Sequence, residues 1–185
     1  MKKLSILLFL FFSFHSLCQQ TTLPRPEMNI DSFMKSRQIE AIGKPFPEFN
    51  TFLQEKAFKN QNLLGKVVFV NFWFESCAPC LAEFDALNDM YDKLKSKTDF
   101  EFISFTFEPQ EKINEIVKKS NIQYKVVSLP ENDIRRLNLN NGFPTSFILD
   151  RQGIIKFAKF TSSSDKKIAT EIVLSDFYPK ILTEL

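Results

Sequence analysis

Two cysteines separated by two residues, Cys77 and Cys80, are the most reactive feature of this 185-residue chain. They follow an apolar run at 66–74 and begin an amphipathic stretch, so the pattern predicts a dithiol at the N-terminus of a helix. The unpaired N–H groups and the positive dipole end of a helix favour a thiolate, which is the nucleophilic form of cysteine. The spacing therefore predicts a redox pair in which Cys77 is unusually nucleophilic near neutral pH.

Residues 1–18 have the pattern of a secretory signal peptide. Two lysines precede an apolar run, and small residues stand three and one before Gln19. The uninterrupted apolar run covers only residues 6–12, far short of the roughly 20 residues that span a membrane. We therefore expect an exported, periplasmic chain that begins at Gln19. The alternative is a lipid anchor at Cys18, because bacterial lipoprotein signals are cut before a cysteine that follows an apolar stretch.

Removal of residues 1–18 excludes several other kinds of site. It takes two of the 24 basic residues and none of the 22 acidic ones, so the formal charge falls from +2 to zero and no basic patch for nucleic acid is expected. It also takes His15, the only histidine, which excludes Ser-His-Asp and Cys-His catalytic groups. A zinc site would need a second pair of ligands beside Cys77 and Cys80. We expect neither a metal nor another cofactor.

Strand and helix patterns alternate through the rest of the chain. Residues 66–74 have the pattern of a strand buried on both faces, and an amphipathic helix follows from 79 to about 97. Further strands are expected at 49–53, 100–107, 124–129, 145–150 and 154–160, a helical turn at 60–64, and helices at 110–119, 131–137 and 164–182, the last kinked at Pro179. This alternation predicts an α/β fold with β-α-β crossovers.

Several short motifs resemble the thioredoxin superfamily. They are Asn71-Phe72-Trp73 before Cys77-Ala78-Pro79-Cys80, and Gly142-Phe143-Pro144-Thr145 before a strand. Three further features resemble its exported branch, the TlpA/ResA-like thiol-disulfide oxidoreductases: Gly43-Lys44-Pro45-Phe46-Pro47-Glu48-Phe49, Gly65-Lys66-Val67-Val68, and Glu83. The resemblance implies a thioredoxin-like fold, with a central mixed β-sheet flanked by helices. It places that domain at 41–185, after an N-terminal extension or linker at 19–40.

The resemblance also implies an enzyme that exchanges disulfides with protein cysteines. Cys77 matches the attacking nucleophile and Cys80 the resolving cysteine, and the two form the redox disulfide. Pro144 matches the cis-proline of the family and, with Phe143 and Trp73, would bind the substrate segment beside the dithiol. The implied partners are cysteine-containing protein substrates and a membrane-linked thiol donor.

Two of these positions have a second explanation, and three others depart from or refine the pattern. Glu83 is either a proton relay or a first-turn acid favoured by the helix dipole. Trp73 either borders the site or is an ordinary core residue. Asn71 stands where cytoplasmic thioredoxins carry a buried Asp, and Ser76 where a Trp commonly precedes the first cysteine. Pro79 resembles the reducing members, which favours a reductant.

Two alternative functions stay open from the sequence. A thiol peroxidase shares the pattern at the start of the domain, but peroxiredoxins typically carry Thr three residues before the attacking cysteine, where this chain has Phe74. The other alternative is a binding module that keeps the fold without redox activity. The presence of both cysteines and of a candidate cis-proline argues against that module.

Overall fold

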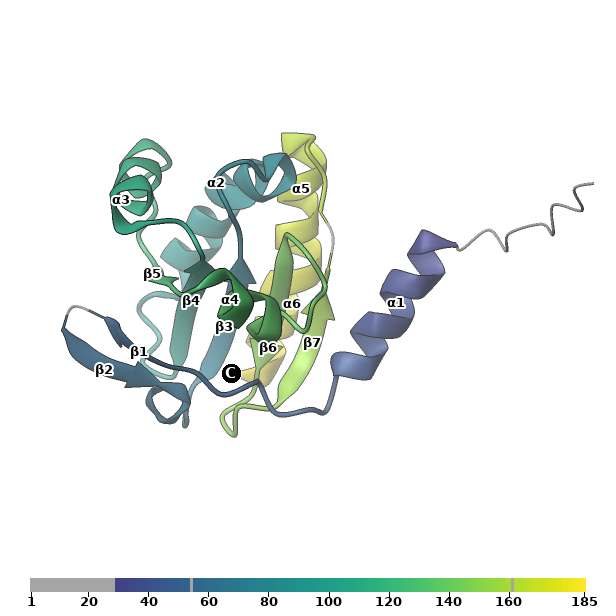
Figure 1. Cartoon of the computed structure of the whole chain (residues 1–185). Helices are drawn as coiled ribbons and strands as arrows, with labels where there is room; N and C mark the ends of the chain where they lie inside the picture. Colours follow the sequence, from purple (N-terminus) through teal and green to yellow (C-terminus); the bar gives the residue numbers. More distant parts are fainter. Residues whose placement is uncertain (1–28, 54, 161) are drawn as a thin grey trace, which may run out of the picture.

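The described part of the chain, residues 29–53, 55–160 and 162–185 of a computed structural model, alternates between strands and helices (Figure 1). In chain order the elements are α1 (Ile30–Ala41), β1 (Asn50–Leu53), β2 (Lys56–Lys59), η1 (Asn60–Asn62), β3 (Val67–Phe72), α2 (Ala78–Leu94), β4 (Phe100–Thr106), α3 (Gln110–Lys119), β5 (Lys125–Ser128), α4 (Glu131–Leu137), β6 (Thr145–Leu149), β7 (Ile155–Lys159), α5 (Lys166–Ile172), η2 (Val173–Phe177) and α6 (Tyr178–Glu184). The signal peptide expected at 1–18 and the alternative anchor Cys18 lie outside the described residues. Within those described, no helix has the length and apolar character needed to cross a membrane.

Strands β3 to β7 form one mixed sheet in the order β5-β4-β3-β6-β7. Strands β3, β4 and β5 are parallel, whereas β6 runs antiparallel to β3 and β7 antiparallel to β6. The predicted α/β fold with a central mixed sheet is therefore confirmed. Because β3 and β4 are parallel neighbours, the loops that follow them meet at one edge of the sheet, and the cysteines lie where the first of these loops leads into α2.

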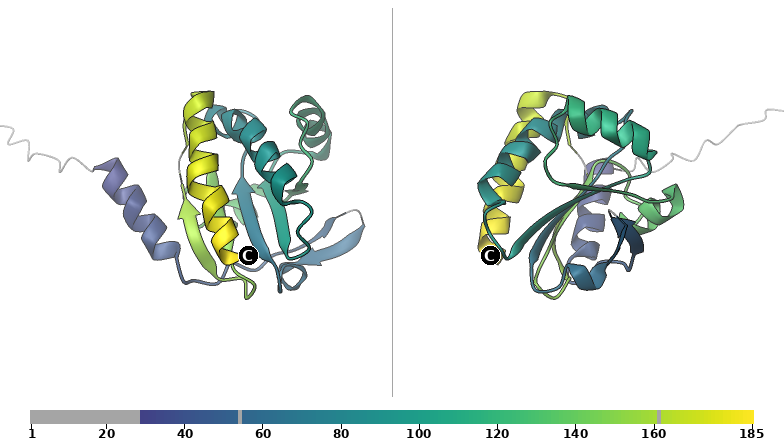
Figure 2. Two further views of the ribbon diagram at one scale, coloured as in Figure 1. Left: turned by 180° about the vertical axis from the view of Figure 1, so that it is seen from behind. Right: turned by 90° about the vertical axis from the view of Figure 1, so that its left-hand side faces the viewer.

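Helices cover both faces of the sheet (Figure 2). On one face, α2, α3, η2 and α6 pack over alternate residues of β3, Val67 and Phe69. On the other face, α4, the end of α1 and the β1–β2 hairpin pack over Val68 and Val70. This division follows from the two-residue period of a strand, which sends successive side chains to opposite faces. Both cysteines lie in the apolar cluster under α2.

The structure differs from the sequence predictions around the start of the domain. The strand expected at 49–53 is β1, which pairs with β2 in a separate two-stranded sheet and does not join the main sheet. Part of the extension expected at 19–40 forms α1, which begins at an Asn29 cap whose Oδ1 accepts the N–H of Ser32 at 3.0 Å. The helix has little apolar periodicity, so the pattern did not reveal it.

The C-terminal helix is interrupted rather than simply kinked. The π-helical segment η2 separates α5 from α6, and Pro179 lies in the first turn of α6. A proline has no N–H to donate to the carbonyl four residues earlier, and for Pro179 that carbonyl belongs to Ser175 in η2. The irregularity predicted at Pro179 therefore occupies the turn that precedes it.

Candidate active site

Cys77 is the N-cap residue of α2, and Cys80 is the third residue of the helix. The two form a disulfide, with their Cα atoms 5.2 Å apart. The Sγ of Cys77 also accepts a hydrogen bond from the backbone N–H of Cys80, with N and S 3.3 Å apart. An N-cap side chain normally accepts from the second or third helical residue, and here the second is Pro79, which has no N–H. The Cys80 N–H is thus the capping donor for the Cys77 sulfur.

The two cysteines differ in access to solvent. Cys77 is 5% exposed and is flanked by the exposed residues Ser76 and Ala78, whereas Cys80 is 1% exposed. The backbone around Cys77 therefore lies at the surface, and Cys80 lies beneath it in the apolar cluster under α2. Cys77 is thus the more exposed of the two sulfur-bearing residues, which agrees with the predicted roles of an attacking Cys77 and a resolving Cys80.

The loop between α4 and β6 lies beside this helix start and carries a cis peptide bond between Phe143 and Pro144. The ring of Phe143 packs edge-on against Phe74, with centroids 5.1 Å apart, and the carbonyl of Phe74 accepts the N–H of Cys77 at 3.1 Å. Phe107 completes a three-ring cluster, with its centroid 5.6 Å from Phe74 and 5.8 Å from Phe143. All three rings are partly exposed, so they form an aromatic rim next to the dithiol.

Trp73 lies in the core directly before this loop and is fully buried. Its ring packs edge-on against Phe84 of α2 at 5.4 Å, in the same apolar cluster as both cysteines. The explanation of Trp73 as a core residue therefore fits its burial, and the expected contact with a substrate segment does not. In the disulfide form it presents no surface to a substrate.

Asn71 stands on β3 under α2 and is hydrogen-bonded on both sides. Its Nδ2 donates to Ser146 Oγ at 3.1 Å, and Ser104 Oγ donates to its Oδ1 at 3.4 Å. The strand register aligns these three residues across β4, β3 and β6. An amide does not titrate, so the position that holds an acid in cytoplasmic thioredoxins is a structural link between strands here.

Glu83 follows Cys80 by three residues on α2 and is 1% exposed. Burial raises its pKa to about 7, against the opposing effects of a hydrogen bond with Ser162 and the positive charge of Lys159. Among the described residues, its Oε2 has no hydrogen-bond partner. Glu83 is the sixth residue of α2, and the first turn of this helix carries no acid, so the explanation as a first-turn acid is wrong. A carboxyl group with a pKa near 7 gives and takes a proton at neutral pH, and the role of Glu83 as a proton relay stays a prediction.

The sequence did not reveal three residues that interact with Glu83 through a hydrogen bond or through charge: Lys159, Ser162 and Tyr124. Lys159 ends β7, where its Nζ pairs with Asp176 Oδ2 at 2.7 Å. Burial raises the pKa of Tyr124, and the charge of Glu83 adds to that rise. In the sequence, Lys159 stands on the apolar side of a short strand, which is unusual for a lysine. The pairing of β7 with β6, which turns Lys159 toward α2, could not be predicted from the sequence. Within the described ranges, no three His, Cys, Asp or Glu side chains are placed to hold a metal ion.

Comparisons with known proteins agree with this geometry. The family model of the AhpC/TSA family matches residues 42–158. The thiol-disulfide oxidoreductase ResA of Bacillus cereus is 32% identical over 123 residues, which cover 65% of this chain and 70% of that protein. The thiol:disulfide interchange protein DsbE of Haemophilus influenzae is 27% identical over 97% of both chains. A crystal structure of a thioredoxin-family thiol:disulfide interchange protein from Chlorobium tepidum is 25% identical, with a TM-score of 0.56, and the match covers 72% of this chain and 96% of that one. The chain therefore belongs to the AhpC/TSA family, and it is a thioredoxin-like thiol-disulfide oxidoreductase.

Proposed function

We propose that this protein is exported and reduces disulfides in other proteins through Cys77 and Cys80. The observation that carries the proposal is the N-cap position of Cys77, whose sulfur accepts the N–H of Cys80 at 3.3 Å. In the reduced protein, this donor and the dipole of α2 stabilise a thiolate at Cys77, which is the nucleophilic form of the side chain.

The exchange proceeds in two steps. The Cys77 thiolate attacks one sulfur of the substrate disulfide, forms a mixed disulfide and expels one substrate thiolate. Cys80 then gives its proton to Glu83 and attacks the Cys77 sulfur, which releases the second substrate thiolate and forms the Cys77–Cys80 disulfide. The substrate has gained two electrons, and both of its thiolates take protons from solvent or from Glu83. A membrane-linked dithiol then returns two electrons to the protein.

The substrate segment lies beside Pro144 and across the aromatic rim of Phe74, Phe107 and Phe143. The support for this placement is that the rim is partly exposed and directly contacts the loop that carries Cys77. An extended backbone next to the cis-proline is the family's mode of binding. The substrate class is therefore a cysteine-containing protein segment rather than a small thiol.

Two sequence features support the location and the direction. Residues 1–18 have the pattern of a signal peptide, and removal of this segment leaves a chain whose only two cysteines are the redox pair. Pro79, between the cysteines, resembles the reducing members of the superfamily. Both features agree with a reductant that acts outside the cytoplasm.

Trapping the mixed disulfide tests the roles of the two cysteines. With Cys80→Ser, the adduct between Cys77 and a disulfide-containing protein should accumulate, because no thiol resolves it. With Cys77→Ser, no adduct should form. Both are measured as the mass of the complex under non-reducing conditions. An adduct that forms through Cys80 in the Cys77→Ser protein would overturn the assignment.

The reduction potential of the pair tests the direction of transfer. A reductant should have a potential closer to that of thioredoxin, about −270 mV, than to that of DsbA, about −120 mV. A value at the oxidising end would make the protein an oxidant. Turnover of hydrogen peroxide faster than that of free dithiothreitol would favour the peroxidase alternative instead.

A further inference from the structure

The loop that carries the cis-proline contains an unusual backbone conformation on its outer side. Leu139 and Asn140 have φ angles of 57° and 56°, so two consecutive residues with side chains occupy the left-handed region. That region is strained for residues other than glycine, and it persists where the surrounding structure holds it in place. The hydrogen bonds that hold this loop therefore bear on the position of Phe143 and Pro144.

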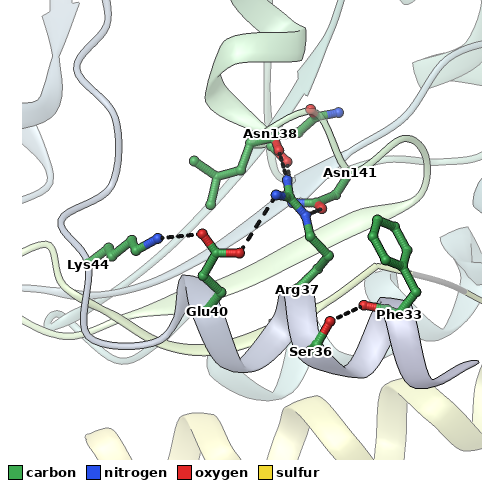
Figure 3. Close-up of polar contacts among 8 residues, drawn as sticks. Phe33, Ser36, Arg37, Glu40, Lys44, Asn138 and Asn141 are labelled. Carbon is green, nitrogen blue, oxygen red and sulfur yellow. Dashed lines mark hydrogen bonds and ion pairs between the residues drawn. The ribbon is translucent and has the colours of Figure 1, made fainter.

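A single arginine of α1 supplies two of these hydrogen bonds (Figure 3). Arg37 Nη2 donates to the carbonyl of Leu139 at 2.6 Å, and its Nε donates to Asn141 Oδ1 at 3.0 Å. Glu40 lies 3.8 Å from Arg37 Nη1 and is itself paired with Lys44 at 3.1 Å. The Arg37 guanidinium is thus held by Glu40 on one side and by the loop on the other. Its planar arrangement of N–H donors allows it to bond two loop acceptors at once.

The hydrogen bonds continue from Arg37's acceptors to the edge of the cis peptide. Asn141 Nδ2 donates to the carbonyl of Asn138 at 3.0 Å, and Asn138 Nδ2 donates to the carbonyl of Gly142 at 3.0 Å. The same Gly142 carbonyl accepts the hydroxyl of Thr145 at 2.9 Å. Asn138 is 1% exposed, and the contacts themselves are partly buried. Gly142 and Thr145, the last two residues of this series, flank Phe143 and Pro144.

We propose that Arg37 is a positioning residue that holds the cis-proline loop in the conformation that binds the substrate segment. The inference rests on the proposed function. Helix α1 precedes residues 42–158, which the AhpC/TSA family model matches, so Arg37 lies in the N-terminal extension and its acceptors lie within the matched segment. The extension therefore acts on substrate recognition and is not only a spacer before the domain.

Substitution of Arg37 by alanine in the full chain tests the proposal. The reduced protein is mixed with a disulfide-bonded peptide and, separately, with 2-hydroxyethyl disulfide, which has no backbone to bind. We expect the half-saturating peptide concentration to rise about ten-fold, because a small displacement of a positioning loop has effects of this size. The limiting rate and the rate with 2-hydroxyethyl disulfide should change by less than about two-fold, because Cys77 and Cys80 keep their helix.

Two further variants control for charge and for folding. Lys35→Ala removes one positive charge from an exposed position of the same helix and should leave the peptide reaction unchanged. Asn141→Ala removes one of Arg37's acceptors and the donor to the Asn138 carbonyl, and it should show a rise of the same kind, which keeps the test available if Arg37→Ala does not fold. Amide hydrogen exchange at 138–142 should be faster in Arg37→Ala than in Lys35→Ala.

Three outcomes separate this inference from the proposed function. If Arg37→Ala and Lys35→Ala have the same half-saturating peptide concentration, the inference is wrong. It is also wrong if Arg37→Ala slows the peptide and the small disulfide equally, because the effect then lies at the dithiol. If the unsubstituted protein reduces neither disulfide, the proposed function fails, and hydrogen exchange at 138–142 still decides whether Arg37 holds the loop.

Discussion

Two buried polar side chains lie close to the first turns of α2, and they differ in how completely they are hydrogen-bonded. Asn71 and Glu83 are each 1% exposed. The amide of Asn71 has a serine hydroxyl on each side. Glu83 has one carboxyl oxygen without a hydrogen-bond partner among the described residues, and its pKa is raised to about 7. One polar group is therefore satisfied and inert, and the other can change its protonation state.

The difference shows how one apolar layer can hold both a structural and a chemical polar group. A buried group with all of its partners stabilises the strands that it joins, because its desolvation is offset. A buried acid without full compensation favours its neutral form, which is the property that a proton carrier needs at neutral pH. The predictions below test this contrast, beginning with the largest expected effect.

The stability of the oxidised protein should depend on pH through Glu83. Its folded pKa of about 7 lies above its ordinary value of 4.5, so the folded state keeps a proton that the unfolded state has already lost between these values. Stability should therefore fall as pH rises through this window, by about 3 kcal/mol in total, and level off above it. Urea unfolding of the wild type and of Glu83→Gln between pH 4.5 and 8 measures the difference. Substitution of the exposed Glu171 by Gln should leave the slope in place.

Glu83→Gln should also slow the resolving step by about 100-fold, because general acid–base groups contribute on this order. The first attack by Cys77 should change little. In the wild type, the resolving rate should rise as pH increases through about 7, since Glu83 must be ionised to accept the Cys80 proton. Rapid-quench measurement of the mixed disulfide separates the two steps. Resolution at the wild-type rate in Glu83→Gln would show that water or another group takes the proton.

Asn71→Ala should affect stability rather than chemistry. It leaves the hydroxyls of Ser104 and Ser146 without their shared partner and creates a cavity, so we expect a loss of about 2 kcal/mol in the free energy of unfolding. The rate of disulfide exchange per folded molecule should stay within about two-fold of the wild type, a small change on the scale of catalytic residues. Asn88→Ala is the matched control, because it removes a single hydrogen bond, to the carbonyl of Ser120, that does not join strands of the sheet. It should lower the free energy of unfolding by less than Asn71→Ala does. A large loss of exchange rate in Asn71→Ala would break the contrast with Glu83.

The parts of this site that sequence reasoning located are local in the chain. The apolar strand, the two cysteines and the helix that follows occupy consecutive residues, so their mutual geometry follows from periodicity and capping. The strands and helices from residue 66 to residue 160 were predicted within a few residues of their ends for the same reason. The strand β2 was missed because Lys56–Lys59 is short and half of its residues are charged, and its pairing with β1 does not follow from its pattern.

Contacts between distant segments were not predictable in the same way. Lys159 reaches the surroundings of Glu83 only because the sheet places β7 two strands away from β3 and turns its alternate residues toward α2. Arg37 meets Asn141 across 104 positions of sequence. Hydrophobic periodicity does not predict either contact, Lys159 with Glu83 or Arg37 with Asn141, because each depends on how separate elements pack.

The sequence alone determined the chemistry, because a Cys-x-x-Cys motif at the start of a predicted helix specifies both the reactive atoms and the dipole that activates them. Only the tertiary structure decided how that chemistry is supported. Burial raises the pKa of Glu83, a property of the packed environment and not of the residue type. The contact between α1 and the cis-proline loop likewise exists only after the chain has folded, because packing of the domain brings together two segments that are distant in the sequence.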